Sequence, residues 1–301
     1  MQKIDSIVAV AGWEERFVLG FRKTLEEHAP SNVMVIAFEE YLDVTAENRS
    51  QVKQLSEAAN AVYTELRVRR EAPASVWEEV TSVLSSEEWS KKSVLVDITT
   101  MPREVIWLFF GGLEDAGSTI SYVYYRPGEY ASEWVTRDTE RPRLVYQNSG
   151  VSEFGRDTCL VVLSGFDVDR VAQMIQFFEP AAILIGLQTG TQFENQRKNI
   201  ERHRLQLAGF KQIKYFDIDA YSSDHGFASI ENVTTEEREK YNIVAASLGP
   251  KLSAIALYQL HGKYPTLALA YAPSRQFNAG YSKGIGEPVI GHLAPTVTRN
   301  L

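Results

Sequence analysis

The chain has 301 residues, of which 44% are hydrophobic and 23% are charged. This composition excludes collagen-like, low-complexity and wholly disordered chains, and the length suits two lobes of about 150 residues each. Lysine and arginine number 31 against 39 aspartate and glutamate, so the net charge of −8 has the wrong sign for a protein that coats long nucleic acid through counterion release. Binding of a short or cyclic nucleotide is compatible with this negative net charge, because a few local cations suffice to bind it.

The cysteine and histidine content narrows the setting further. Cys159 is the one cysteine, which excludes intrachain disulfides and cysteine-based zinc sites and favours a reducing compartment. No apolar run approaches the roughly 18 to 20 residues that span a bilayer, and no signal peptide is visible. We therefore expect a cytoplasmic protein that does not bind membranes. The five histidines are scattered, so we expect no metal and no cofactor.

Short β-branched runs alternate with helical stripes over residues 1–127, a pattern typical of a parallel sheet flanked by helices. The predicted strands are residues 6–11, 33–38, 65–68, 93–98 and 119–125. The predicted helices are residues 14–28, 47–61, 75–84 and 102–115. Pro102 suits a first helical position, where its missing N–H costs nothing. We expect a first Rossmann-like lobe over this range.

Residues 128–157 break this rhythm. The ranges 134–137 and 143–147 read as two strands around 138–142, so we expect a hairpin-like, β-rich insert that links two lobes.

A second Rossmann-like lobe is predicted over residues 158–279. Its expected strands are 159–163, 182–187, 213–218, 243–246 and 266–271, and its expected helices are 167–178, 193–208 and 250–262. The tail over 280–301 is rich in glycine and proline, which predicts no regular structure there. The predicted fold class is α/β, with two parallel-sheet lobes.

An internal duplication relates the two lobes. A segment starting at Val94 aligns with one starting at Asn242, and further blocks align near residues 8 and 161 and near 33 and 183. The paired positions, each 148 residues apart, are Thr99 with Ser247, Pro102 with Pro250, and Arg103 with Lys251. Ligands of open parallel sheets bind beyond the carboxyl ends of the strands, so we expect the equivalent loops of both lobes to face one shared cleft.

The repeated hydroxyl-x-x-Pro-cation turn is a compact receptor for an anion. Bare N–H groups at a helix start favour a phosphate, and Arg103 or Lys251 supplies the counter-charge. The alternative for Thr99, Thr100 and Ser247 is N-capping of the following helix, which needs no ligand. A cap does not require a cation at the same offset in both lobes, which favours the receptor.

A strand, a small-hydroxyl turn, a lysine and a helix resemble the Gly-Thr-Lys signature of CARF domains, the CRISPR-associated Rossmann-fold sensors of cyclic oligonucleotides. The tandem arrangement resembles the SAVED sensors of related antiviral systems. The resemblance covers most of the chain as topology, but as sequence only Ser247-Leu-Gly-Pro-Lys251 and Asp97-Ile-Thr-Thr-Met-Pro-Arg103, and both copies depart from the signature by placing Pro before the cation. It implies phosphate contacts from Lys251 and Arg103, with Thr99 and Ser247 beside them. No effector domain is visible, so a separate effector protein is a possible partner.

Other loop residues are candidates for the same ligand. The loop after residue 187 offers amides for a base or ribose and a glycine for close approach, namely Gln188, Thr189, Gly190, Gln192 and Asn195. The alternative is that Thr191 and Glu194 form a capping box that only starts the helix.

Two further groups of residues follow predicted strands. Arg275 and Asn278 follow the last strand and are candidates for a phosphate and a base edge, with Phe277 stacking. Trp13 and Phe166 occupy matching first loops, where they would sandwich bases or belong to the core.

An acidic cluster after the strand 213–218 admits two interpretations. Asp217, Asp219, Asp224 and His225 form either a metal or acid–base site or a solvated loop with side-chain turns.

Three classes of function fit these patterns. The first is a sensor of a cyclic or short oligonucleotide, bound between the lobes. The second is an enzyme on a nucleotide or phosphoester, with catalytic candidates Lys251, Ser247, Glu194, Asp217 and Asp219. The third is a non-catalytic subunit of a larger complex. No histidine lies next to a plausible nucleophile in the sequence, so we expect binding to outweigh turnover.

Overall fold

The computed structural model describes residues 3–130, 136–165, 167–189, 196–278, 280 and 282–294. The chain divides into two compact units, one formed by residues 1–134 with 278–295 and the other mainly by residues 135–277. Each unit is an α/β lobe, which confirms the predicted fold class.

The first unit is built on a six-stranded sheet in the order β16-β5-β4-β1-β2-β3. Its parallel strands are β1 (Ser6–Val10), β2 (Asn32–Phe38), β3 (Val62–Val68), β4 (Ser93–Asp97) and β5 (Thr119–Tyr125), and β16 (Pro288–His292) runs antiparallel to β5. Buried β-branched runs such as β1 form the centre, because a parallel sheet is covered on both faces.

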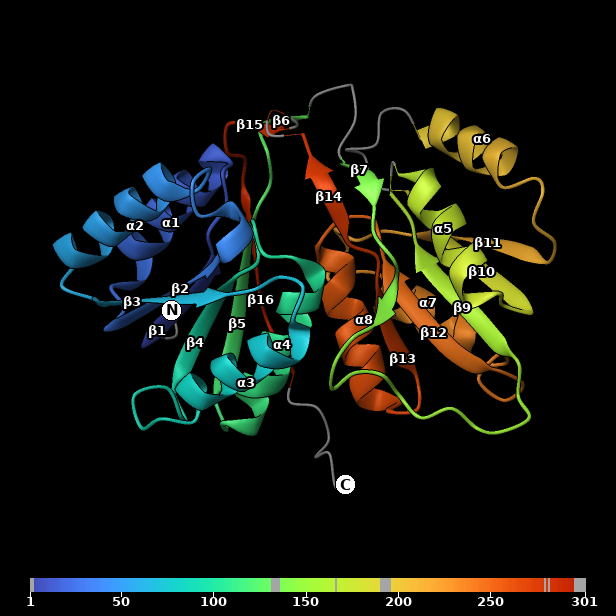
Figure 1. Ribbon diagram of the computed structural model, residues 1–301, viewed down its shortest axis with the longest axis horizontal. Coiled ribbons are helices and arrows are strands. Elements are labelled where there is room, and N and C mark those ends of the chain that lie inside the picture. Colours follow the sequence, from blue (N-terminus) through green and yellow to red (C-terminus); the bar gives the residue numbers. More distant parts are fainter. Residues whose placement is uncertain are drawn as a thin grey trace. The chain divides into compact units, whose positions relative to one another are not determined.

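Helices cover both faces of this sheet (Figure 1). They are α1 (Glu15–His28), α2 (Ala46–Ala58), α3 (Pro73–Leu84) and α4 (Arg103–Asp115), with a short 3₁₀ helix η1 (Glu39–Tyr41). Phe17 and Phe21 of α1 pack with Val52 of α2 against the same side of β1, β2, β4 and β5. Helices α3 and α4 contact each other and lie on the opposite face.

The second unit repeats this topology with a sheet in the order β11-β10-β9-β12-β13-β8. Its parallel strands are β9 (Thr158–Leu163), β10 (Ala182–Gln188), β11 (Ile213–Ile218), β12 (Asn242–Ser247) and β13 (Ala268–Tyr271), and β8 (Arg143–Leu144) runs antiparallel to β13. Five parallel strands in one order, with an antiparallel strand at the same edge, are what a duplication of the lobe predicts.

The helices of the second unit are α5 (Val168–Phe178), α6 (Gln196–Gln206), α7 (Phe227–Thr234) and α8 (Leu252–Lys263). Val171 and Met174 of α5 pack with Leu207, just after α6, on one face of the sheet, and α7 contacts α8 on the other. The eight-residue α7 lies in a stretch where the sequence pattern predicts no helix.

Two expectations about the linker and tail are wrong. The insert is β-rich as predicted, but its described strands do not pair with each other as a hairpin: β7 (Thr136–Thr139) pairs with β14 (Ser274–Phe277), and β8 pairs with β13. The tail is not irregular, because it contains β15 (Ser282–Lys283), which pairs with β6 (Glu129–Tyr130), and β16. Without a further strand, the outer edges of β5 and β13 would have unpaired backbone groups. These groups form hydrogen bonds with β16 and β8, which are distant in sequence.

The alignment of the two lobes by 148 residues is wrong by one. Leu95 of β4 packs in the core under α1, and Val244 of β12 packs in the equivalent core under α5. These two residues are therefore structural counterparts. The helix N-caps Pro102 and Lys251 agree, and both pairs are 149 residues apart. A one-residue slip moves a strand residue to the opposite face of its sheet.

The corrected register changes which residues are equivalent. Ser247 corresponds to Ile98 and not to Thr99, and Lys251 precedes its helix while Arg103 is the first residue of α4. The hydroxyl residues Thr99 and Ser247 are therefore not equivalent positions, and neither are the cations Arg103 and Lys251.

Candidate functional site

The carboxyl edge of the first sheet is closed by contacts within the lobe. A Cβ at Gly12 would lie 2.6 Å from the Cγ2 atom of Thr100, so the first turn and the turn after β4 are in contact. Thr100 Oγ1 donates to the carbonyl of Val10 at 2.6 Å. Thr99 Oγ1 accepts from the backbone N–H of Tyr125 at 3.0 Å. Both hydroxyls thus bond to strand backbone, and α4 has no side-chain cap, so the N-capping alternative is wrong here.

A buried ion pair lies in the first turn of α1. Arg16 is 1% exposed and donates from Nε to Glu14 Oε2 at 2.9 Å, with a second, shorter bond from Nη2. Its Nη1 donates to the carbonyl of Tyr125 at 3.2 Å. Glu14, which is 9% exposed, also accepts from Ser282 Oγ at 2.7 Å. The cation of this turn is therefore neutralised by the lobe itself.

Trp13 and Arg103 lie on the same edge. Trp13 is half-buried and packs edge-on against Tyr41, with ring centroids 5.4 Å apart. Asn48 of α2 donates to the carbonyl of Gly12 at 2.8 Å and so fixes the first turn from the neighbouring helix. Arg103 is half-buried at the start of α4.

In the second lobe the equivalent turns approach through glycines. A Cβ at Gly165 would lie 2.9 Å from the Cα atom of Gly249, and one at Gly249 would lie 2.7 Å from the carbonyl oxygen of Ser164. Only glycine allows this approach of backbone to backbone. The turns that precede α5 and α8 are thus in direct backbone contact.

Arg170 lies in the first turn of α5, the helix that follows the turn at Gly165. It is 6% exposed, and its Nη2 donates to the carbonyl of Ala272 in a short hydrogen bond. The carboxylate of the N-cap residue, Asp167, accepts from the backbone N–H of Arg170 at 3.3 Å. Burial lowers the pKa of Arg170, and the nearby Tyr271 and Asp167 oppose that shift.

Ser247 and Lys251 lie at the carboxyl end of β12. Ser247 is 1% exposed, and in the described part of the chain its Oγ has no hydrogen-bond partner. Its neighbours Ala246 and Leu248 face α5, so its own side chain faces α8. Lys251 is the half-buried N-cap residue of α8, which has no side-chain cap.

Gln188 and Thr189 are engaged within the lobe. Gln188 is buried; its Oε1 accepts from the N–H of Ala220 at 3.2 Å and its Nε2 donates to Ser253 Oγ at 3.4 Å. Thr189 donates from its backbone N–H to the carbonyl of Ile218 at 2.9 Å. The other candidates from this loop and the matching first loop lie outside the described residues, namely Phe166, Gly190, Gln192, Glu194 and Asn195, as does the predicted capping box.

The acidic cluster forms a turn that starts α7. Asp224 accepts from Ser222 Oγ at 2.8 Å and from the N–H groups of Gly226 and Ala228 at 3.0 and 2.9 Å; these bonds hold its pKa below the ordinary value despite its partial burial. His225 Nδ1 contacts the carbonyl of Ala220, and burial lowers the pKa of His225.

Of the two remaining acids, Asp219 lies near His225 and helps to form the turn, and Asp217 belongs to the preceding strand. Asp217 is an exposed residue of β11, and Asp219 Oδ1 accepts from the N–H of Tyr221 at 2.9 Å. Within the described ranges, no group of three or more histidine, cysteine, aspartate or glutamate side chains could hold a metal ion. The interpretation as side-chain turns fits these contacts.

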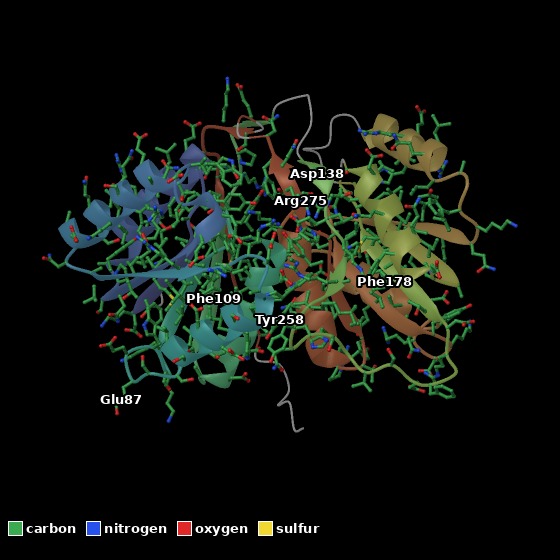
Figure 2. All side chains as sticks on the ribbon, viewed as in Figure 1. Glu87, Phe109, Asp138, Phe178, Tyr258 and Arg275 are labelled. Atoms are coloured by element: carbon green, nitrogen blue, oxygen red, sulfur yellow. The ribbon has the colours of Figure 1, made fainter. Side chains whose placement is uncertain are left out.

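Arg275 and Asn278 flank the end of β14. Arg275 is exposed and lies across the small sheet from Asp138 of β7 (Figure 2), with its Nε 3.7 Å from Glu140 Oε1. Asn278 Oδ1 accepts from the N–H of Gly280 at 3.1 Å. Arg275 presents its guanidinium to solvent, whereas Asn278 shapes the turn that follows.

Two features escaped the sequence reasoning. Ser164 Oγ and His203 Nε2 share a short hydrogen bond, and both residues are fully buried. They are far apart in sequence, so no local pattern predicts the pair. The second feature is the pair Arg16 and Arg170, which the sequence could have indicated. A cation in the first turn of a helix is unfavourable with the helix dipole, so it is expected to have a specific anionic or carbonyl partner.

The chain is a twin-lobed protein of doubly wound α/β units whose candidate sites lie at the carboxyl ends of the parallel strands. In the part of the chain that the structure describes, no helix is both long and apolar enough to cross a membrane. No protein-family model and no curated protein matches the sequence.

Solved structures do resemble the fold. A type III CRISPR defence DNA nuclease activated by cyclic oligoadenylate aligns with a TM-score of 0.54 and 9% identity, over 84% of this chain and 63% of that one. This chain thus spans less than two thirds of that nuclease. A UDP-GlcNAc 2-epimerase from Neisseria meningitidis aligns over 81% of this chain and 77% of its own with 11% identity, but its TM-score of 0.26 is too low to support a structural conclusion. The first likeness shows a shared fold.

Proposed function

We propose that this protein is a sensor that binds a cyclic or short oligonucleotide at the carboxyl ends of its parallel strands. The observation that carries the proposal is the meeting of two helix-leading turns at Gly165 and Gly249, beside Lys251 at the start of α8. Backbone N–H groups at helix starts bind phosphate, the glycines bring the two helix-leading turns together, and the lysine adds a positive charge.

The class of ligand is suggested by the structural likeness. The aligned nuclease is one activated by cyclic oligoadenylate, and its fold aligns with 84% of this chain. We propose that the ligand is a related second messenger in prokaryotic defence signalling, and that a separate effector protein reads the bound state. That one ligand contacts the edges of both sheets stays a prediction.

An enzymatic role is the second candidate, and the Ser164–His203 hydrogen bond is the observation that favours it. A serine bonded to a histidine is the arrangement of an activated nucleophile. The first lobe offers a structural explanation, however, since Asn48 of α2 fixes its first turn just as His203 of α6 fixes the turn containing Ser164. Both residues are also buried, so a substrate would need an opening to reach them.

Calorimetric titration tests the proposal. The purified full chain is titrated with cyclic oligoadenylates of several ring sizes, cyclic dinucleotides and their linear forms, and every mixture is then separated by chromatography. The sensor predicts saturable binding of at least one cyclic ligand that is recovered intact. Rapid conversion of a ligand, abolished by Ser164→Ala, would support the enzyme, and absence of binding across the panel would reject the sensor.

A further inference from the structure

We infer that the second lobe holds a phosphate-binding site centred on Arg170, whereas the matching site in the first lobe is filled by the carboxylate of Glu14. This site rests on the proposed function for its biological role. It specifies which side chain binds a phosphate group of the ligand. It also assigns different roles to two lobes of common topology.

Arg16 and Arg170 are counterparts in the two lobes. Each lies in the first turn of the helix that follows the first parallel strand of its sheet, β1 or β9, and each is at least nine-tenths buried. Arg16 donates to the carbonyl of Tyr125 and Arg170 to that of Ala272. These two acceptors are equivalent in register. The last residue of β5 that pairs with β4 is Val123, the last residue of β13 that pairs with β12 is Ala270, and each acceptor follows two residues later.

The two arginines differ in what neutralises them. Glu14 is the N-cap residue of α1, and its carboxylate accepts two hydrogen bonds from the guanidinium of Arg16. Its counterpart Asp167, the N-cap residue of α5, is one methylene shorter and caps the backbone N–H of Arg170 instead. The nearby carboxylate of Asp167 favours the charged form of Arg170, but in the region that the structure describes the buried Nε of Arg170 has no hydrogen-bond partner.

A buried guanidinium with an unpaired N–H donor is unfavourable, because desolvation of a charge is costly unless hydrogen bonds and an anion compensate it. The lowered pKa of Arg170 reflects this burial. An anion at Nε would complete the hydrogen bonding and the charge balance at once. Arginine suits this role since its fork of donors matches phosphate oxygens. The glycine-lined turns at Gly165 and Gly249 lead the helices on this same edge.

Pyrophosphate serves as the probe, so the test does not depend on the identity of the natural ligand. Thermal unfolding of the full chain is followed by circular dichroism with increasing pyrophosphate, at ionic strength held constant with sodium chloride. The variants are Arg170→Met, Arg170→Lys and, as the matched control in the other lobe, Arg16→Met. Because Arg16→Met lowers stability by itself, each variant is compared with its own ligand-free melting temperature. We expect pyrophosphate to raise the melting temperature of wild type and of Arg16→Met, and Arg170→Met to lose this response with an apparent affinity lower by about tenfold or more. Arg170→Lys should retain part of it.

A second variant keeps the inference testable if Arg170→Met does not fold. Asp167→Glu places in the second lobe the residue type that neutralises Arg16 in the first, and it preserves the net charge. We expect it to fold and to show a weakened pyrophosphate response, because its own carboxylate competes for Arg170. An unchanged response in Asp167→Glu together with Arg170→Met, or the same loss in Arg16→Met as in Arg170→Met, would overturn the inference.

The outcome can be separated from that of the proposed function. An Arg170-dependent pyrophosphate response without binding of any cyclic oligonucleotide would leave the anion site standing and reject the sensor. Binding of a cyclic oligonucleotide that is unaffected by Arg170→Met would retain the sensor and reject this site.

Discussion

Replacing Arg16 by methionine should destabilise the first lobe severely. The substitution keeps a long apolar side chain but removes the cation from Glu14, which is 9% exposed, and the hydrogen bond to the carbonyl of Tyr125. Breaking a buried ion pair by removing one partner costs about 3 to 5 kcal/mol, because a charge is left buried without compensation. For a lobe of this size, that loss lowers the melting temperature by roughly 6 to 20 °C.

Tryptophan fluorescence reports this loss selectively. All five tryptophans lie in the first 134 residues, namely Trp13, Trp77, Trp89, Trp107 and Trp134. Urea unfolding followed by fluorescence therefore measures the lobe that carries Arg16, while circular dichroism measures both. The double variant Glu14→Gln with Arg16→Met should recover much of the lost stability, since no uncompensated charge remains. A loss below about 1 kcal/mol in Arg16→Met, the size expected of an exposed pair, would refute the reasoning.

Four further predictions follow from other parts of the second lobe. Lys251→Ala should weaken a phosphate-bearing ligand by about 1.5 to 3 kcal/mol, the range for a charge-assisted hydrogen bond, and equal affinities in calorimetry would contradict it. Gly249→Ala should cost about 1 to 3 kcal/mol through overpacking, whereas Gly209→Ala, where an added Cβ meets no atom within 4 Å, should leave urea unfolding nearly unchanged. Burial lowers the pKa of His225 from its ordinary value of 6.5, so the neutral form is favoured in the folded state and stability should fall as the pH drops below about 6.5; His225→Asn should flatten that slope. Turnover of a bound oligonucleotide should stay below about 1 per second, and a faster rate that Ser164→Ala removes would identify a catalytic site.

Much of the fold is predictable from the sequence because its strands are buried on both faces. Runs such as Ser93–Asp97 read as strands without any knowledge of their partners, and helices such as Glu15–His28 show a clear apolar stripe. The edges are harder to predict. Pro288–His292 forms an antiparallel edge strand although it contains proline and glycine, since an edge strand tolerates both, and the pairing partner lies more than 160 residues away.

The site is less predictable than the fold, since its chemistry depends on register and on distant contacts. Sequence comparison placed Ser247 opposite Thr99, yet the alternation of strand side chains puts them on different faces. Thr99 bonds the strand backbone, while the buried Ser247 hydroxyl faces α8. Glu14 and Asp167 differ by a single methylene. The sequence alone does not show that this difference matters, because the equivalence of Arg16 and Arg170 depends on the carbonyls to which they donate.

The most direct test of the central claim is equilibrium titration of the full-length protein with cyclic oligoadenylates, with wild type and Arg170→Met compared in the same calorimetric experiment. The account predicts saturable binding of a cyclic oligonucleotide to wild type, recovery of that ligand intact, and binding to Arg170→Met that is weaker by about tenfold or more. No heat of binding from any cyclic or linear oligonucleotide, with a correctly folded protein by circular dichroism, would contradict it.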